Sequence, residues 1–287
     1  MRVSQGTRVR GRLIVGALVV AGLCGCGEKP PRAAPSAVPQ RVICASPAVA
    51  EIVFALGCGD RVVGVSEFTD WPPEAAGRPM IGSAFAPNRE RILALAPDGL
   101  LTQGRSAALA TFARAQGIGF RTVPLDTLAD VRGAISAFAE ILGVPERGRE
   151  LLKTMEADFA ALAPCGPVAT FIALGHAPGD LAGLMTAGPG TFLAEIVARA
   201  GGRNVFADVD VLWPKVSQET LVRRRPERIL DFQDAPADAA RRAALLADWE
   251  KLGFRSDQVR ILDDASLLKP GPRAAQSAAS LSKAICN

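Results

Sequence analysis

The predicted fold is organised around the segment PERGRELLKTMEADFAALA, residues 145–163. Its spacing places five apolar residues on one face of an α-helix: Leu151, Leu152, Met155, Phe159 and Leu162. Pro145 suits the first position of a helix, and Pro164 and Gly166 end it. At about 1.5 Å per residue the helix would run about 28 Å, roughly the width of a small domain. We interpret it as a connection between two lobes; the alternative is an ordinary surface helix within one domain.

Strand and helix signals alternate on both sides of this helix, which predicts parallel α/β layers. Residues 41–143 and 165–287 are the two predicted lobes, and residues 144–164 join them. A long irregular run, residues 66–88, interrupts the first lobe, and a run of that length is usually functional. The expected strands are 41–45, 61–65, 98–102, 120–123, 168–174, 228–232 and 259–262. The expected helices are 48–56, 90–96, 106–116, 127–142, 191–200, 217–225, 238–252 and 272–285.

The two lobes repeat short sequence patterns in the same order. Glu51-Ile52-Val53 before Gly57 matches Glu195-Ile196-Val197 before Gly201. A second match pairs Glu90, Ile92, Pro97, Leu100 and Leu101 with Glu219, Leu221, Pro226, Ile229 and Leu230. We infer a pseudo-duplicated body with a cleft between its halves; a pattern common to any helix-to-strand junction is the alternative.

The first 25 residues have the features of a lipoprotein signal peptide. Four arginines precede an apolar run of 11 residues, Leu13 to Leu23, and no acidic residue occurs among them. Such a run is too short to span a bilayer as a mature helix. Leu23-Cys24-Gly25-Cys26 resembles a bacterial lipoprotein box with Cys26 as the lipidated residue, which predicts a lipid anchor at a membrane. A plain secretory signal is the alternative.

A proline-rich segment follows the predicted anchor. Residues 26–40 include EKPPRAAPSAVPQ, which has four prolines and few large apolar side chains, as a semi-extended linker does. The net charge of +4 belongs to the leader, because removal of its four arginines leaves 29 basic against 29 acidic residues. A near-neutral mature chain has no electrostatic footprint for nucleic acid.

Four cysteines remain in the mature chain: Cys44, Cys58, Cys165 and Cys286. An exported compartment permits disulfides, and four cysteines allow three pairings. Because Cys165 borders the second lobe and Cys286 lies next to the C-terminus, these two are one possible pair; the sequence does not choose among the pairings.

Motifs of common enzyme chemistries are missing from the sequence. It has no GxxxxGK[ST] phosphate loop, no GxSxG elbow, no HExxH, and no GxGxxG that opens a helix after a strand. A single histidine, His176, leaves no histidine set for bare zinc or manganese and no supported catalytic triad. We therefore expect neither an enzyme nor a resident cofactor; a hydrolase that depends on His176 is the weaker alternative.

Several segments carry a shared signature. In the first lobe they are RVICASPAVAEIVFALGCGDRVVGVSEFTDWPP and PNRERILALAPDGLL, and in the second TAGPGTFLAEIVARAGGRNVFADVDVLWPKVSQETL and LDDASLLKPGPR. Together they resemble the periplasmic binding proteins of ABC importers for cobalamin, haem and iron-siderophores, over residues 41–285. The resemblance implies an α/β fold of two Rossmann-like lobes joined by one long α-helix, with a ligand cleft between the lobes. It also implies delivery of the ligand to an ABC permease dimer with its ATPase.

In that family one glutamate at the tip of each lobe pairs with arginines of the permease. By motif, these positions match Glu90 in NRERI and Glu219 in SQETL. Two exposed carboxylates, one on each lobe, would steer and register the complex. Compensation of the helix dipole is the alternative role, because both residues fall at a helix N-terminus.

The resemblance also implies loop aromatics that cover a large flat ligand. Phe68 and Trp71 lie in SEFTDWPP, Phe85 in GSAFAPN and Trp213 in LWPKVS. Aromatic side chains offer a broad apolar area with little entropy to lose. Packing within the core or the hinge is the alternative for each of them.

Three further residues are candidates for ligand contact. His176 follows a second-lobe strand, and its neutral imidazole could be the axial metal ligand of a bound chelate; a solvated loop residue is the alternative. Met185 on the same loop could assist or cover the ligand. Asp264 matches a cleft acid of cobalamin-binding relatives, with a turn residue as the alternative.

The sequence contains no tyrosine, so the phenolate ligand of several haem-binding relatives cannot exist here. We therefore expect a substrate-binding lipoprotein that captures a bulky metal chelate, with cobalamin or a related corrinoid as the first choice. Haem or a ferric siderophore is the alternative ligand, and a surface-anchored sensor or interaction module without transport is the alternative class. We expect an exported, lipid-anchored monomer in the periplasm or at the cell surface.

Overall fold

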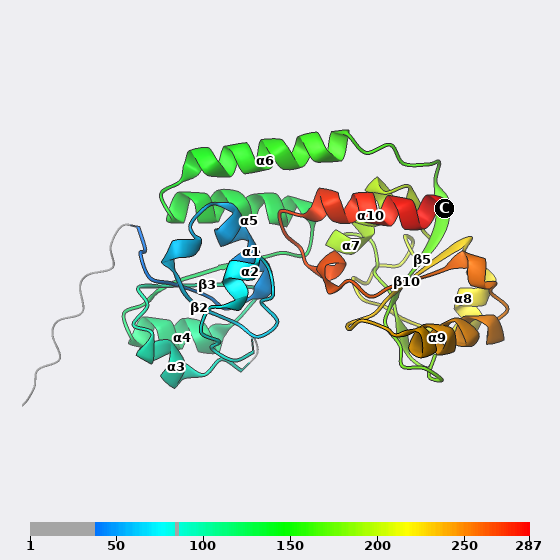
Figure 1. Cartoon of the computed structure of the whole chain (residues 1–287), viewed down its shortest axis with the longest axis horizontal. Coiled ribbons are helices and arrows are strands. Elements are labelled where there is room, and N and C mark those ends of the chain that lie inside the picture. Colours follow the sequence, from blue (N-terminus) through cyan, green and yellow to red (C-terminus); the bar gives the residue numbers. More distant parts are fainter. Residues whose placement is uncertain (1–37, 84–85) are drawn as a thin grey trace, which may run out of the picture. The chain divides into compact units, whose positions relative to one another are not determined.

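The first lobe is built on four parallel strands in the order β2–β1–β3–β4 (Figure 1). The structure is a computed structural model that describes residues 38–83 and 86–287; the predicted leader, Cys26 and Phe85 lie outside them. The central strand is buried throughout, as a parallel sheet covered on both faces requires. The elements are β1 (Val42–Cys44), α1 (Pro47–Ala55), the 3₁₀-helix η1 (Gly59–Arg61), β2 (Val62–Val65), α2 (Pro73–Ala76), α3 (Arg89–Ala94), β3 (Gly99–Gln103), α4 (Ala107–Ala115), β4 (Gly119–Val123) and α5 (Leu128–Ile141).

The second lobe has its own four parallel strands, in the order β10–β9–β5–β7, and a short antiparallel pair, β6–β8. Because the two large sheets are separate, the expected fold of two α/β lobes is confirmed. The elements from the connecting helix onward are α6 (Pro145–Ala160), β5 (Val168–Leu174), β6 (Leu184–Met185), α7 (Phe192–Arg199), β7 (Gly202–Asn204), β8 (Lys215–Val216), α8 (Gln218–Arg224), β9 (Arg228–Phe232), α9 (Ala239–Lys251), η2 (Ser256–Gln258), β10 (Val259–Leu262), η3 (Ala265–Leu268) and α10 (Ala274–Cys286).

Helix α6 packs against α5 of the first lobe and α10 of the second (Figure 1). Met155 and Phe159 are buried, and the remaining leucines of the predicted apolar face pack against the same cluster. The helix ends at Ala160 rather than Ala163; Pro164 disfavours helical backbone only at Ala163, so it explains why the helix does not reach that residue. The cluster continues from α1 and α5 into α7 and α10, so the lobes share one apolar core beside α6.

A glutamate from each lobe binds the start of a helix in the other. Glu51 of α1 forms a two-point ion pair with Arg273, the residue that caps α10, with both N–O distances 2.9 Å. Glu195 of α7 accepts the backbone N–H of Leu128, the first residue of α5, at 2.6 Å. These are the two glutamates of the repeated Glu-Ile-Val pattern, so the repeat in sequence corresponds to reciprocal contacts between the lobes.

The second repeated pattern also has one structure in both lobes. Asn88 and Ser217 cap α3 and α8 with side chains that accept a backbone N–H three residues later. After each helix a residue with positive φ stands directly before a proline: Ala96 at +43°, two residues after α3 ends, and Arg225 at +48°, directly after α8. The strands β3 and β9 follow, each at a central position of its sheet. The helix-to-strand junction is therefore duplicated in detail, which supports pseudo-duplication.

A disulfide joins the beginning of the second lobe to the end of the chain. Cys165 and Cys286 are bonded across 121 residues, which confirms the pairing considered possible from the sequence. Cys44 and Cys58 are free and buried, and burial raises the pKa of the Cys44 thiol.

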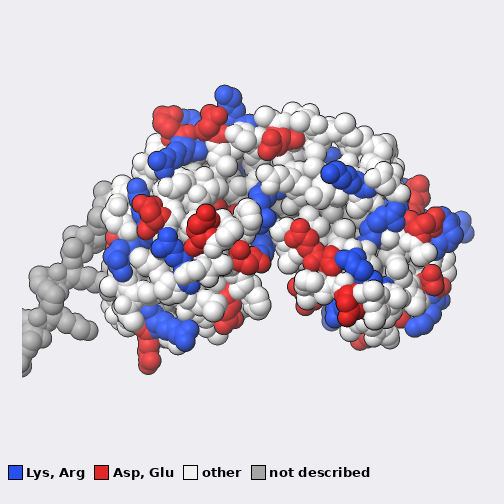
Figure 2. All heavy atoms as spheres, in the orientation of Figure 1, with Lys and Arg blue, Asp and Glu red and all other residues white. Residues whose placement is uncertain are grey.

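The surface of the described body is hollowed between the lobe that carries α3 and α4 and the lobe that carries α9 (Figure 2). Two connections close the back of this hollow: the shared core beside α6, and the reciprocal glutamate contacts. Within residues 38–83 and 86–287, no helix has both the length and the apolar character that crossing a bilayer demands.

Candidate ligand-binding site

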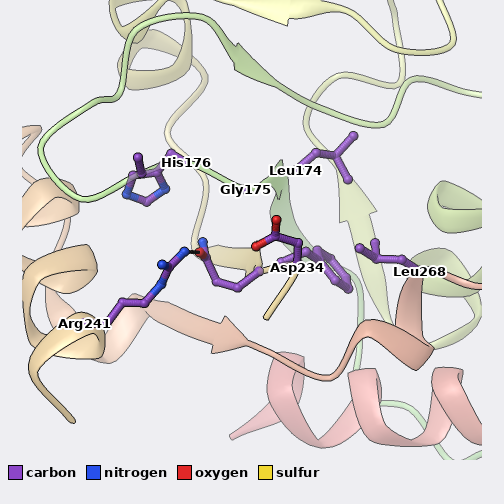
Figure 3. Close-up of a pocket in the computed structure, with 9 residues that line it drawn as sticks. Leu174, Gly175, His176, Asp234, Arg241 and Leu268 are labelled. Carbon is purple, nitrogen blue, oxygen red and sulfur yellow. Dashed lines mark hydrogen bonds between the residues drawn. The ribbon is translucent and has the colours of Figure 1, made fainter. Parts of the chain in front are cut away.

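A cavity of about 370 Å³ opens at the carboxyl ends of two neighbouring second-lobe strands, β5 and β9 (Figure 3). The carboxyl ends of parallel strands are where α/β folds usually bind ligands. Residues 174–177 and 232–234 come from the strand ends, while Arg241 of α9 and Leu268 of η3 complete the lining. The cavity therefore combines an apolar wall with a carboxylate, an amide and a guanidinium.

A buried hydrogen-bond network holds the polar side of this cavity in place. Asp231, at the end of β9, accepts from Trp249 Nε1 and from Gln233 Nε2, both at 2.8 Å. The Gln233 Oε1 in turn accepts from Arg241 Nη2 at 3.1 Å. Because Asp231 and Trp249 are fully buried, this relay orients the Gln233 amide and the Arg241 guanidinium before any ligand arrives.

The imidazole of His176 lies in the wall of the second lobe rather than exposed on its loop. Its side chain is 2% exposed, and its ring meets the Trp249 ring edge-on at 5.3 Å between centroids. Nδ1 lies 3.4 Å from an Asp231 oxygen, and Nε2 lies 3.7 Å from an Asp248 oxygen. The solvated alternative is therefore wrong, because the ring is buried. Neither ring nitrogen has a hydrogen-bond partner among the described residues, and metal ligation by His176 stays a prediction.

Asp248 is a buried carboxylate with strong donors around it. It accepts the backbone N–H of Gly179 at 2.6 Å and the Lys251 Nζ at 2.8 Å. Burial raises the pKa of Asp248, but these hydrogen bonds and the Lys251 charge outweigh burial, so the pKa lies below its usual value. The ionised carboxylate thus stabilises the loop that carries His176.

The first-lobe aromatics Phe68 and Trp71 are at the surface. Phe68 is 81% exposed and has φ of +61°, a left-handed conformation that is unusual for a bulky residue. Strain of this kind is kept where the surroundings enforce it, often at functional sites. Trp71 is 44% exposed, and the Arg273 guanidinium lies over its ring at 4.7 Å. Packing in the core is therefore excluded for Phe68, while Trp71 packs partly on Arg273.

The Arg273 side chain also lines a second cavity, of about 340 Å³, beside Trp71, Glu51 and Pro72. Burial lowers the pKa of Arg273, but the ion pair with Glu51 raises it above its usual value. Arg273 is thus a fixed positive charge that ties the start of α10 to the first lobe.

Leu268 and Lys269, at the end of η3, lie next to the first cavity and the aromatic loop respectively. The Lys269 ammonium pairs with Asp70 and lies 3.5 Å from the carbonyl oxygen of Phe68. Burial raises the pKa of Asp70, but the hydrogen bond and charge of Lys269 hold it below its usual value. Since the preceding residue, Leu268, lines the second-lobe cavity, the Phe68 loop and that cavity flank the same short segment.

Met185 lies on β6 of the second lobe, and Trp213 lies two residues before β8, the strand that pairs with β6. Met185 lies opposite Lys215 in the pairing, and the backbone N–H of Gly188 donates to the Leu212 carbonyl at 2.8 Å. Both candidate side chains are partly exposed, but neither lines the cavity at β5 and β9. Their contact with ligand stays a prediction.

Asp264 caps η3, where its side chain accepts the backbone N–H of Ser266 at 2.9 Å. This contact fits the alternative of a turn residue, although η3 also carries Leu268 into the cavity lining. The proposed contact of Asp264 with ligand therefore stays a prediction.

Glu90 on α3 and Glu219 on α8 occupy equivalent positions in the two lobes. Both are exposed in the first turn of their helices. One turn later each helix exposes an apolar side chain, Leu93 at 40% and Val222 at 43%. Each lobe therefore presents a carboxylate and an apolar group three residues apart on a short helix.

Sequence reasoning missed Gln233, Asp234 and Arg241 of the cavity and the Glu51–Arg273 pair. The first two directly follow a strand that was correctly predicted, Arg228–Phe232, so the rule for parallel strand ends could have identified them. Arg273 and Glu51 lie 222 residues apart, and no local pattern connects them.

Comparison with known proteins identifies the family. The periplasmic binding protein family matches residues 42–231, more than half of the chain, and the chain belongs to that family. This chain is 31% identical over 205 residues to the vitamin B12-binding protein of Pectobacterium atrosepticum. The matched region covers 68% of this chain and 72% of that relative.

Solved structures agree with this assignment. The periplasmic haem-binding protein RhuT from Roseiflexus sp. RS-1 superposes with a TM-score of 0.73 at 27% identity, covering 86% of this chain and 97% of RhuT. The periplasmic vitamin B12-binding protein BtuF of Vibrio cholerae gives a TM-score of 0.66 at 26% identity, covering 85% and 97%. The resemblance to the class of binding proteins for B12, haem and siderophores is confirmed, and these relatives are solute-binding proteins rather than enzymes.

Proposed function

We propose that this protein captures a bulky metal chelate between its lobes and delivers it to an ABC permease. The observation that carries the proposal is the segment at residues 268–269: Leu268 lines the second-lobe cavity, and Lys269 holds the loop of the exposed, strained Phe68. An exposed aromatic ring and a preorganised polar cavity, placed on either side of one segment, suit a large ligand with an apolar face and polar edges.

A corrinoid is the first choice of ligand. The chain has no tyrosine to serve as a haem phenolate ligand, and His176 is buried in the second lobe beside Asp231 and Asp248. The similarity to vitamin B12-binding proteins supports the same choice. Haem or a ferric siderophore is the alternative, favoured by the similarity to the haem-binding RhuT.

Glu90 and Glu219 are the proposed contacts with arginines of the permease dimer and its ATPase complex. Their equivalent positions, their exposure, and the apolar Leu93 and Val222 one turn away support a two-point docking surface. A carboxylate beside an apolar group favours a partner that presents arginine beside an apolar surface. Loss of transport without loss of ligand binding is the expected result of changing these two glutamates.

Export and lipid anchoring belong to the same proposal. The arginine-rich apolar leader and the box that ends at Cys26 support a lipid-anchored monomer at a membrane surface in the periplasm or at the cell surface. A surface-anchored sensor that keeps the fold without transport is the alternative class. Adjacent genes for a permease and an ATPase would favour transport over that alternative.

Calorimetric titration of the purified protein with cyanocobalamin, haemin and ferric chelates tests the proposal. The expected result is saturable heat and a spectral change with cyanocobalamin at one site per chain. Tighter binding of haemin or a ferric chelate would replace the corrinoid and keep the class of protein. No response to any of these ligands would contradict chelate capture.

A further inference from the structure

Asp234 is an unpaired carboxylate in the second-lobe cavity. It lies two residues after the buried end of β9, lines the cavity and is exposed (Figure 3). Within the part of the chain that the structure describes, its carboxylate has no hydrogen-bond or ion-pair partner. Since most acids close to a strand end in this lobe are paired, as Asp231 and Asp263 are, Asp234 stands out as an acceptor available to a ligand.

Arg241 supplies a donor to the same cavity. Its Nη2 donates to the Gln233 Oε1 at 3.1 Å, and its Nε is buried with no hydrogen-bond partner among the described residues. Gln233 cannot turn away, because its own amide nitrogen donates to the buried Asp231. The guanidinium is therefore held in one orientation with donor capacity left over, at a site where an unsatisfied buried donor costs free energy.

We propose that Asp234 and Arg241 together recognise a primary carboxamide on the ligand, and so select a corrinoid over haem. A carboxamide has two N–H donors and a carbonyl acceptor, which match the Asp234 carboxylate and the Arg241 guanidinium at once. A carboxylate has only acceptors, so Asp234 repels it. The rim of a corrin ring carries carboxamides, whereas haem carries two carboxylates. This inference rests on the proposed function, which it deepens.

The test compares ligands that differ by a single amide. Cyanocobalamin and each of its monocarboxylic acids, in which one side-chain amide is hydrolysed, are titrated against the wild-type protein and Asp234→Asn. The wild type is expected to bind at least one monocarboxylic acid about tenfold or more weakly than cyanocobalamin, the size of a lost hydrogen bond to a charged group plus the repulsion. Asp234→Asn removes the negative charge. It is expected to reduce the ratio of the affinity for cyanocobalamin to the affinity for this monocarboxylic acid by several-fold, and to strengthen haemin binding.

Glu250→Gln is the matched control, because it removes an exposed carboxylate of α9 that has no partner within residues 38–83 and 86–287 and does not line the cavity. It is expected to leave the ratio and haemin binding unchanged. Arg241→Gln is a second variant. It is expected to bind cyanocobalamin more weakly than the wild type does, and to bind the same monocarboxylic acid more weakly than it binds cyanocobalamin. Equal melting temperatures for Asp234→Asn and the wild type exclude misfolding as the cause.

The outcomes separate the inference from the function on which it rests. Suppose that the wild type binds cyanocobalamin tightly and that Asp234→Asn has the same ratio of affinities for cyanocobalamin and the monocarboxylic acid. Carboxamide recognition by Asp234 is then overturned, whereas corrinoid capture still stands. Preference of the wild type for haemin overturns the inference and the corrinoid choice but not chelate capture. If the wild type binds none of these chelates, the proposed function and the inference both fail.

Discussion

Phe68 combines an exposed ring with a backbone conformation that a bulky side chain disfavours. A left-handed conformation costs roughly 1–2 kcal/mol for a residue with a side chain. The residue is kept in place by its surroundings, since the Lys269 ammonium approaches its carbonyl oxygen and pairs with Asp70. Backbone strain of this kind is retained where the side chain has a function, and we propose that the Phe68 ring covers a flat ligand.

Phe68→Gly separates the backbone strain at this position from the contribution of the ring to ligand binding. Glycine adopts positive φ freely, so the free energy of unfolding is expected to stay equal or to rise by about 1 kcal/mol. Loss of the ring is expected to weaken corrinoid binding by roughly threefold to tenfold. Urea unfolding and calorimetry measure the two effects. Phe68→Ala is the control, since it loses the ring but keeps the strain; full ligand affinity in both variants would show that Phe68 does not cover the ligand.

Asp248 gives a prediction about acid stability. The pKa of Asp248 is lower in the folded than in the unfolded state, where it is about 3.9. Its ionised form therefore stabilises the fold at pH values above the unfolded pKa. This stabilisation is lost as the pH falls through the folded pKa. Asp248→Asn is therefore expected to lower the free energy of unfolding by about 1–3 kcal/mol at pH 7. The difference from the wild type should shrink below about pH 4.

Urea unfolding at pH 7, 5 and 3.5 measures this dependence. Asp158→Asn, which changes an exposed carboxylate of α6 without a partner among the described residues, serves as the control and should cost little at any pH. A pH-independent loss in Asp248→Asn would mean that its packing, rather than its charge, stabilises the loop of His176.

At the scale of elements, the sequence predicted most of the fold because apolar periodicity is local. The strands at Val168–Leu174, Arg228–Phe232 and Val259–Leu262 match their expected bounds, and the remaining predicted strands and helices differ by a few residues at their ends. The pattern missed β7, which begins with a glycine and gains its structure by pairing with β5. It also missed β6 and β8, which are too short to show alternation.

The site was harder to predict because it depends on contacts between distant segments. Exposed aromatics in the 66–88 loop could be identified from a long loop rich in turn residues. The burial of His176 could not, because it requires Asp231 from β9 and Asp248 from α9 to meet a loop more than fifty residues earlier. The functional assignment of individual site residues therefore needs the fold first.

The ion pair between α1 and the start of α10 is expected to contribute strongly to the join between the lobes. Arg273→Ala would leave Glu51, which is 5% exposed, as an uncompensated buried charge, and a loss of about 3–5 kcal/mol in the free energy of unfolding is expected. Glu51→Gln with Arg273→Ala should cost less than the sum of the two single changes. Urea unfolding of all four proteins measures the coupling.

Arg255→Ala is the control for the charge pair, because Arg255 and Asp257 are both exposed and their pairing should contribute far less. Additive effects of the Glu51 and Arg273 changes would contradict the coupling and would leave the shared apolar core as the main connection between the lobes.

For the whole molecule, the contacts between lobes predict limited motion. The core shared by α5, α6, α7 and α10 and the reciprocal glutamates join the lobes at the back of the hollow. Small closure around a ligand, rather than a wide hinge, is the expected behaviour. Release of the ligand would then require the permease to pull the lobes apart, and each lobe would need its own contact with the permease.

Double replacement Glu90→Gln with Glu219→Gln tests this two-point docking. Uptake of labelled cyanocobalamin through the cognate importer is expected to fall by about tenfold or more, whereas the affinity of the isolated protein for ligand stays unchanged. Glu150→Gln is the control and should transport normally, because Glu150 is exposed on α6 and has no partner in the part of the chain that the structure describes. Normal uptake by the double variant would assign these glutamates to helix-dipole compensation alone.

A crystal structure of the protein with bound cyanocobalamin would show where the ligand lies. We expect one corrin ring in the hollow between the lobes, in contact with Phe68, with a side-chain carboxamide between Asp234 and Arg241 and with His176 still buried beside Asp231 and Asp248. A corrinoid bound outside the hollow, or a ligand that leaves both the Phe68 ring and the second-lobe cavity untouched, would contradict this expectation.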